Sequence, residues 1–261
     1  MNTSGDVFYL KTNNGYILKP IIETYSCCTK FMTLNITKVG MSSYVLGENH
    51  AVLIESEFPA SRFDKYVCNS NINIMIATDE LNQDTKNIKR KHTTHMSIAK
   101  ANTDRLAVSV STNDENDNSS MSHIKITEVY DSVVLDTAFQ YAQVYKINAK
   151  DLNRTIKELS KIGDTTDVIG YKSALVLRHT EDGMTKKEYR FNITRSDGDD
   201  TVSIYSKSVD TKLLNNIAKA LTVAKNVSIS VCSGLPIKLE IDSGSIVITK
   251  IYIKTHDMKS G

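Results

Sequence analysis

The residues best suited to chemistry in this sequence are cations spaced along a segment of helical period. In "NAKDLNRTIKELSKIGD" (148–164), Arg154, Lys157 and Lys161 recur at intervals of three and four, which places them on one side of an α-helix. A second concentration is the run "KRKH" at 89–92. Exposed lysine and arginine neutralise phosphate groups without reading bases. Cations of this kind, gathered on one common surface, would suit a polyanion such as a nucleic-acid backbone.

Three further segments have helical period, at 15–29, 78–88 and 210–225. Each of them carries lysines at polar positions. For any single helix, a solvated charged face is the simpler explanation. The recurrence of the bias in four segments weakens that explanation. In these three segments, the lysines at polar positions include Lys19, Lys86, Lys212 and Lys219.

The elements that must position these helices are strands. Stretches such as "NINIMIA" (71–77), "NVSISVC" (226–232) and "SIVITKIYIK" (245–254) alternate apolar and polar residues, which predicts strands with one buried face. About a dozen or more such stretches occur. Each half of the chain contains a helix, several strands, a second helix and more strands, so the sequence predicts a duplicated α+β unit. Asn148 and Thr78 are suited to cap two of the helices.

The composition is that of an ordinary globular protein, with 40% hydrophobic and 24% charged residues. A net charge of +2 is too small to identify a nucleic-acid partner by itself. The sequence has no run of about 18 apolar residues, as a membrane helix needs, and its first residues do not resemble a signal peptide. We therefore expect no membrane association.

No catalytic or cofactor-binding motif occurs, and we expect neither an enzyme nor a cofactor. The four cysteines form no C-x-x-C pair, and we expect Cys68 and Cys232 to be buried thiols. "DGDD" (197–200) could hold a divalent ion, but a hairpin turn explains it more simply. We expect no metal site.

Four stretches carry a resemblance to a known family. From Phe63 to Val110 the chain resembles the first half of the eukaryotic and archaeal sliding clamp, proliferating cell nuclear antigen, beginning with "FDKYVCNSN". "ELSKIGD" (158–164) is similar to the end of that family's third helix, and "ISVCSGLPIKLEI" (229–241) to its closing strands. "GYILKPIIE" (15–23) is similar to its opening helix. The order and spacing of these pieces make coincidence unlikely.

The resemblance implies an α+β sliding-clamp fold with two similar domains per chain. Outer β-sheets would surround four helices that line the hole of a ring. It implies an N-terminal domain at 1–125, a connector at 126–145 and a C-terminal domain at 146–261. The ring would be a homotrimer, closed by pairing of a strand near 120–126 with a strand near 186–194 of the next chain.

The resemblance also implies that the ring encircles double-stranded DNA and tethers DNA polymerase and other replication and repair proteins. Contacts with DNA would be weak and independent of sequence, so that the ring can slide. A clamp loader would be a further partner, and the location would be the nucleus or a viral replication compartment. The expected DNA-binding residues are Lys19, Lys86, Arg154, Lys157, Lys161, Lys212 and Lys219.

Clients of this family dock in a pocket near the connector between domains. Carried over by position, the expected partner-binding residues are Leu46, His50, Ala51, Leu53, Val133, Val134 and Pro236. The connector "VYDSVVLDTAFQ" (129–140) departs from the family, because it lacks the usual Gly-x-Pro segment. Lys172 falls where the family often carries a modifiable lysine, although an ordinary exposed lysine is the simpler reading.

Two other functions remain open at this point. The chain could be one subunit of a heterotrimeric checkpoint clamp, or a clamp-fold scaffold for viral transcription or assembly. A checkpoint subunit should fail to trimerise with itself, and a scaffold should lose cations from the hole. The cations are largely kept, which favours the replicative clamp.

Overall fold

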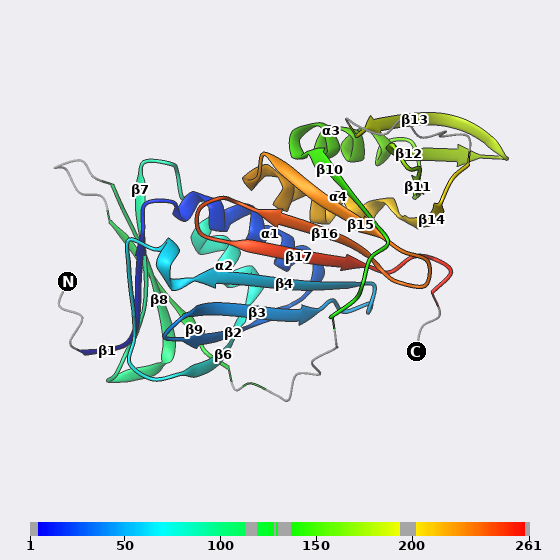
Figure 1. The fold of residues 1–261 in the computed structure, drawn as a ribbon. Helices are drawn as coiled ribbons and strands as arrows, with labels where there is room; N and C mark the ends of the chain where they lie inside the picture. The colour runs from blue at the N-terminus through cyan, green and yellow to red at the C-terminus, as the bar shows by residue number, and fades with distance from the viewer. Residues whose placement is uncertain (1–4, 113–118, 128, 130–136, 194–201, 259–261) are drawn as a thin grey trace. The chain divides into compact units, whose positions relative to one another are not determined.

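The computed structural model describes residues 5–112, 119–127, 129, 137–193 and 202–258. The chain divides into two compact units (Figure 1). The first unit consists of Met1–Val45, Ile54–Val134 and Ser243–Thr249. The second unit consists of Leu46–Leu53, Leu135–Asp242 and Lys250–Gly261. Each unit thus takes in a short segment from the opposite half of the chain.

A five-stranded antiparallel sheet forms part of the first unit. Its strands, in spatial order, are β5 (Lys65–Cys68), β1 (Asp6–Thr12), β7 (His92–Ala99), β8 (Asn102–Thr112) and β9 (Ser120–Lys125). In β1, Phe8, Tyr9 and Leu10 are all buried, so side chains on both faces of this strand are covered. Within the described residues, β9 pairs with β8 on one side and ends the sheet.

The first unit also contains a second set of strands and two helices. The strands are β2 (Phe31–Thr37), β3 (Gly40–Leu46), β4 (Val52–Pro59) and β6 (Ile72–Ala77), with β2 between β3 and β6. The helices are α1 (Leu18–Cys28), preceded by the 3-10 helix η2 (Gly15–Ile17), and α2 (Thr78–Thr85). A further 3-10 turn, η3, covers Ala60–Arg62. Helix α2 contacts both β6 and β9, so it lies between the two sets of strands.

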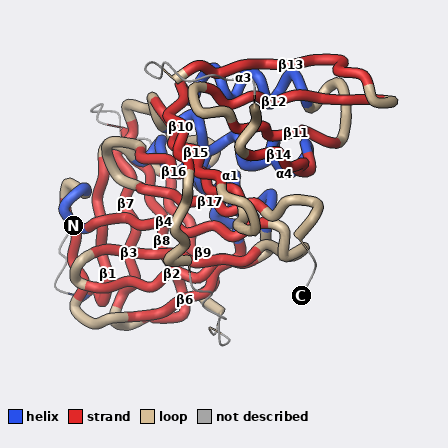
Figure 2. The backbone as a smooth tube through the Cα atoms, turned by 45° about the vertical axis from the view of Figure 1, so that its right-hand side comes forward, coloured by secondary structure: helices blue, strands red, loops and turns tan. Residues whose placement is uncertain are grey.

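The second unit repeats this plan. One sheet has the order β13 (Met184–Asn192), β12 (Ala174–Glu181), β11 (Thr165–Gly170) and β14 (Tyr205–Asp210). Other strands are β10 (Gln143–Asn148), β15 (Asn226–Val231), β16 (Ile237–Asp242) and β17 (Ile248–Ile253), with β15 between β10 and β16. The hairpin of β12 and β13 can be followed in Figure 2, and within the described residues β13 is an edge strand.

The helices of the second unit are α3 (Ala149–Leu159) and α4 (Thr211–Ile217), which continues as the 3-10 helix η4 (Ala218–Val223). Helix α3 contacts β12 of one sheet and β10 and β15 of the other. Apolar side chains from both sheets and both helices meet around a void of about 20 Å³, which marks the core. Among the described residues, no helix is long and apolar enough to cross a membrane.

The element order confirms the predicted duplication. Each unit runs strand, helix, strands, helix, strands. All four helical segments are present, although the first begins as a 3-10 turn and the fourth ends as one. The alternation in "TVSIYSKS" (201–208) predicts a strand from residue 201, but strand β14 begins only at Tyr205, and Ile204 before it is about half exposed. The positions of the predicted domain boundaries stay a prediction, because part of the connector 126–145 lies outside the described residues.

Candidate nucleic-acid interface and apolar pocket

Helices α1 and α2 of the first unit pack antiparallel. The Thr78 hydroxyl at the start of α2 donates to the carbonyl oxygen of Thr29, just after α1, at 2.6 Å. Farther along, Asn82 Nδ2 donates to Ser26 Oγ at 3.2 Å. The prediction that Thr78 caps α2 is wrong: the capping position is Ala77, and the Thr78 side chain is committed to the neighbouring helix.

The predicted DNA-binding lysines of this unit lie on this helix pair. Lys19 is in the first turn of α1 and is half-exposed, while Lys86 is the C-terminal capping residue of α2 and is exposed. The opposite sides of the helices bury Ile21 and Leu81, so the lysines stand away from the core. A cation at the end of α2 is also favoured by the negative end of the helix dipole.

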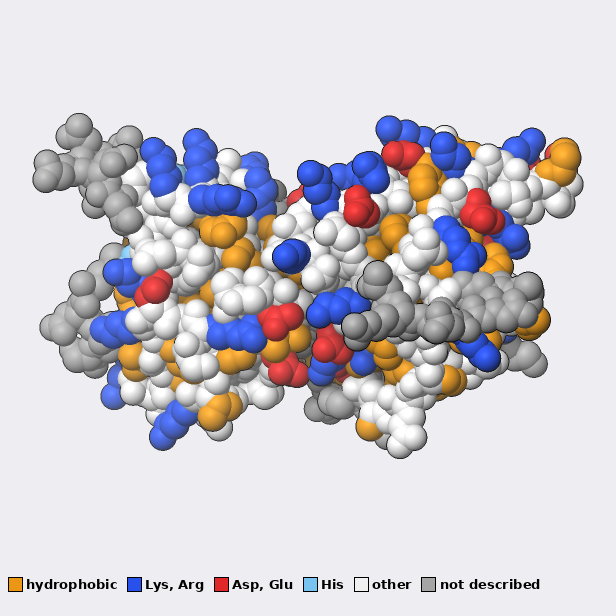
Figure 3. Space-filling view, turned by 45° about the horizontal axis from the view of Figure 1, so that its top comes forward, with side chains coloured by type: hydrophobic (Ala, Val, Ile, Leu, Met, Phe, Trp, Pro, Cys, Tyr) orange, Lys and Arg blue, Asp and Glu red, His pale blue; other side chains and the backbone are white. Residues whose placement is uncertain are grey.

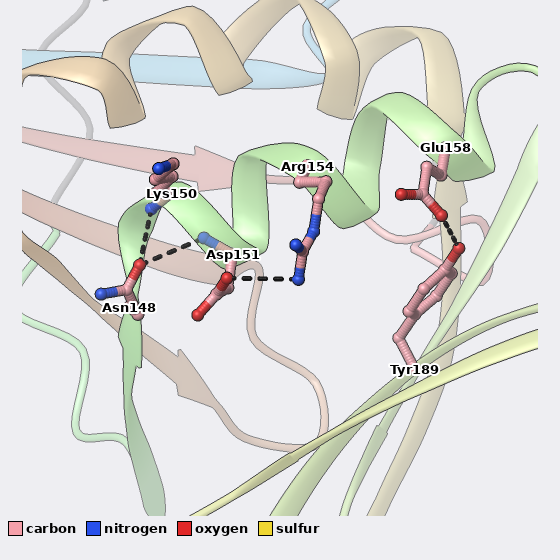
Figure 4. A network of polar contacts seen from close by, with 6 residues as sticks. All are labelled: Asn148, Lys150, Asp151, Arg154, Glu158 and Tyr189. Atoms are coloured by element: carbon pink, nitrogen blue, oxygen red, sulfur yellow. Dashed lines mark hydrogen bonds and ion pairs between the residues drawn. The ribbon is translucent and has the colours of Figure 1, made fainter.

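Helix α3 begins at the predicted cap. Asn148 Oδ1 accepts hydrogen bonds from the backbone N–H groups of Lys150 and Asp151 at 3.0 and 3.1 Å (Figure 4). This satisfies two of the four N–H groups that a helix start leaves unpaired. The prediction for Asn148 is therefore confirmed.

The cations of α3 lie on its exposed side. Arg154 and Lys157 are exposed within the helix, and Lys161 is exposed just beyond its end. Arg154 forms an ion pair with Asp151 at 3.3 Å, with side chains 71% and 53% exposed. An ion pair this exposed contributes little, so it leaves Arg154 able to exchange its partner for a phosphate.

The end of α3 is fixed to the edge strand β13. The Tyr189 hydroxyl donates to the Glu158 carboxylate (Figure 4). Burial and the neighbouring carboxylate raise the pKa of Tyr189 to about 12, so the phenol remains a donor at neutral pH. This hydrogen bond links the end of α3 to the edge strand β13.

The remaining predicted cations lie on α4 and η4. Asp210 caps α4 by accepting from the Leu213 N–H at 2.8 Å. Lys212 is exposed in the first turn, and Lys219 is half-exposed on η4 and takes part in interactions within the chain. Helices α3 and α4 contact each other, so the structure brings the five predicted cations of this unit onto one helix pair. Lys and Arg side chains gather on the surface drawn in Figure 3.

An apolar pocket of about 220 Å³ lies in the second unit. Five of the predicted partner-binding residues line it, namely Leu46, His50, Ala51, Leu53 and Pro236. Val133 and Val134 lie outside the described residues. The lining residues that sequence reasoning missed are Val52, Thr137, Phe139, Tyr252, Lys254 and Met258.

Aromatic rings build one wall of this pocket. Phe139 meets the rings of Tyr141 and Tyr252 edge-on, with centroids 6.4 and 6.2 Å apart. The Tyr141 hydroxyl donates to the Pro236 carbonyl oxygen at 2.9 Å, which fixes the proline that lines the pocket. The aromatic residues in "AFQYAQ" (138–143) are a signal that could have indicated this wall, but nothing local to them indicates Tyr252 as their partner.

Two further predictions from the sequence concern a metal site and the cysteines. No group of three or more His, Cys, Asp or Glu side chains that could hold a metal ion occurs within the described residues, and "DGDD" lies outside them. Cys68 is buried as predicted, and its thiol donates to the Ser70 carbonyl oxygen at 3.1 Å. The prediction for Cys232 is wrong, because that thiol is only half-buried.

Two α+β units with the same element order, each carrying cations on a helix pair, define the two-domain fold of the sliding clamps. A solved structure of proliferating cellular nuclear antigen from Entamoeba histolytica has this fold, with a TM-score of 0.82 and 15% identity. The match covers 96% of this chain and 99% of that one.

Family models extend the likeness to the sequence. The model for the N-terminal domain of proliferating cell nuclear antigen matches residues 7–133, and the model for its C-terminal domain matches residues 136–256. The chain therefore belongs to the proliferating cell nuclear antigen family.

Individual relatives agree. The chain is 22% identical to proliferating cell nuclear antigen of Caenorhabditis elegans over 241 residues, which cover 90% of this chain and 91% of the relative. It is 23% identical to a probable DNA polymerase sliding clamp of Autographa californica nuclear polyhedrosis virus, with 90% of each chain covered. A DNA polymerase sliding clamp of Nitrosopumilus maritimus is 32% identical over 95 residues, 36% of this chain and 38% of the relative.

Proposed function

We propose that this protein is a sliding clamp that encircles double-stranded DNA and tethers a DNA polymerase as a processivity factor. The observation that carries the proposal is the match of both clamp-domain models, in order, along residues 7–133 and 136–256. The role is that of a scaffold and needs no catalytic group. No observation favours the checkpoint or viral-scaffold alternatives.

The DNA-contacting residues of the proposal are cations on helices. Support comes from their positions: Lys86, Arg154, Lys157, Lys161 and Lys212 are exposed on or beside helices whose other sides are buried. Lys19 and Lys219 are half-exposed on the same helix pairs. Long, flexible side chains that meet phosphates and no base edges allow the ring to slide.

The proposed ring is a homotrimer closed by main-chain pairing of β9 with β13 of the next chain. Both strands are edges of their sheets within the described residues. An unpaired edge offers N–H and C=O groups to another strand, which supports this pairing. The solution mass at micromolar concentration tests it: a trimer of 29.1 kDa chains is expected, and a monomer with an intact fold would contradict it.

The apolar pocket is the proposed docking site for the polymerase and other replication or repair clients, and a clamp loader would open the ring. An apolar pocket of this kind suits a peptide with aliphatic and aromatic anchors. The proposed location is the nucleus, or a viral replication compartment.

The direct test is DNA synthesis on a primed circular template with a cognate polymerase and clamp loader. Addition of the protein should lengthen the products made in a single binding event. A variant with Lys86, Arg154 and Lys157 changed to Gln should no longer lengthen the products, although its oligomeric mass in solution should equal that of the wild-type protein. No increase in product length with the wild-type protein would overturn the proposed function.

A further inference from the structure

The basic run 89–92 forms a closed turn between α2 and β7. The His92 N–H donates to the Lys89 carbonyl oxygen at 3.0 Å, and the Lys89 N–H donates to Nδ1 of His92 at 3.3 Å. Ile88, directly before the turn, is 4% exposed and anchors it in the core. Arg90 and Lys91 therefore occupy the two corner positions, and both are exposed.

An aromatic ring supports the first corner residue. The guanidinium carbon of Arg90 lies 5.4 Å from the centre of the Tyr16 ring. Tyr16 is part of η2, which lies tightly against β7: a Cβ at Gly15 would come within 2.0 Å of Thr94 Oγ1. A guanidinium held over a ring in this way keeps its N–H edges available to an oxyanion.

The turn lies where α2 ends and α1 begins, next to Lys86. Because the two helices are antiparallel, the end of α2 lies near the start of α1, and the contact between Arg90 and Tyr16 joins these two ends. Lys86, Lys89, Arg90 and Lys91 place four exposed cations within six residues. Blue side chains gather over the upper part of the first unit, at the left of Figure 3.

A cavity of about 230 Å³ lies next to the turn and is lined by His92 together with Gln83, Asp84 and Asn87. Its amide and imidazole groups could bind an anion, but the Asp84 carboxylate lines the same space. Like charges repel most strongly where water is partly excluded. An anionic ligand is therefore expected at the exposed corner of the turn and not in the cavity.

We propose that the turn Lys89–His92 binds backbone phosphates of nucleic acid, as a second contact segment in addition to the helix cations. The inference rests on the proposed function, since DNA held by α1 and α2 would bring its phosphates to this end of the helix pair. Several exposed cations close together at one turn suit the closely spaced, repeating phosphates of a nucleic-acid backbone better than a peptide with a few acidic side chains.

A turn variant with Lys89, Arg90 and Lys91 changed to Gln tests this proposal. The turn should still form, because its hydrogen bonds come from the backbone and His92. A matched control changes the exposed Lys38, Lys100 and Arg105 of the same unit to Gln, which removes the same charge.

The measurement is the affinity for a short linear duplex between about 50 and 200 mM salt. The slope of log K against log salt is negative, and each lost phosphate contact should reduce its magnitude by about 0.9, so we expect a slope about 2–3 less negative for the turn variant. The control should change the slope by less than about 1. Equal slopes for the two variants would overturn the proposal. It would also be overturned if the turn variant kept the DNA affinity of the wild type but no longer bound an acidic protein partner.

This experiment is separable from the test of the proposed function. Linear duplex binding needs neither a polymerase nor a loaded ring. A wild-type protein that fails to lengthen products on circular DNA would remove the clamp function, whereas the difference between the turn and control variants would still decide whether the turn binds phosphates.

Discussion

At the scale of single residues, Tyr25 makes the stability of the first unit depend on pH. Its side chain is fully buried, and its hydroxyl donates to Ser56 Oγ at 3.0 Å. Burial raises its pKa to about 12, against about 10 in the unfolded chain. The folded state therefore retains this proton between pH 10 and 12, where the unfolded state loses it.

The stability that this difference provides is complete below pH 10 and is lost as the pH rises toward 12. At about 1.4 kcal/mol per pKa unit, the loss assigned to Tyr25 is about 2–3 kcal/mol. We expect Tyr25→Phe to reduce the fall in unfolding free energy between pH 8 and pH 11, measured by urea denaturation. Tyr16→Phe serves as the control, and an identical fall in Tyr25→Phe and wild type would contradict the prediction.

Phe139 is an exposed aromatic residue of the apolar pocket. It is 37% exposed while its ring contacts Tyr252 and Tyr141. We expect Phe139→Ala to weaken binding of a client peptide at least tenfold, about 1.4 kcal/mol, because aromatic side chains dominate such contacts. Calorimetry measures the affinity, and Val144→Ala on β10, 53% exposed, is the control. Unchanged affinity in Phe139→Ala would exclude this wall from the docking site.

At the scale of elements, the start of α3 depends on one side chain. Asn148 satisfies two backbone N–H groups, so Asn148→Ala should lower the unfolding free energy by about 1 kcal/mol. Lys150→Ala, an exposed change in the same turn, should alter it by less than about 0.5 kcal/mol. Urea denaturation followed by circular dichroism measures both. A loss in Lys150→Ala as large as in Asn148→Ala would show that the cap is not the cause.

The helices and their caps show what sequence can predict. Asn148 was predictable because a cap and its two N–H partners lie within three residues. Thr78 was not, because its hydrogen-bond acceptor, Thr29, is 49 residues away in sequence. Strand β1 lacks the clear alternation that reveals a strand, since Phe8, Tyr9 and Leu10 are all buried. Tertiary contacts decide such positions, and local patterns do not report them.

The candidate site also contains some residues that a local sequence pattern predicts and others that it does not. Cations on a helix face follow from periodicity alone, so Arg154 and Lys157 were predictable and are exposed. The pocket combines residues from four separate stretches of the sequence, and sequence reasoning reached Leu53 and Pro236 through family resemblance only. The contact between Tyr252 and Phe139 shows that Tyr252 is part of the pocket, and no spacing in the sequence predicts this contact.

At the scale of the whole molecule, a clamp holds DNA by enclosing it and not by affinity. We expect the loaded protein to remain on a closed circular duplex far longer than on the same duplex after linearisation, because a linear end lets a ring slide off. Residence times measured by single-molecule fluorescence test this expectation. Equal residence on both forms would indicate ordinary electrostatic binding. The linear duplex with blocked ends is the control and should restore the long residence.

The exchange of short segments between the two units has a consequence for synthesis on the ribosome. The first unit includes Ser243–Thr249, and Ser56 Oγ lies 3.0 Å from Thr249 Oγ1 within it. This unit is therefore incomplete until almost the entire chain has been translated, although most of it is made first. Nascent chains that stop after residue 134 should stay sensitive to protease, and a separately expressed N-terminal half should need the C-terminal half in the same cell to become soluble.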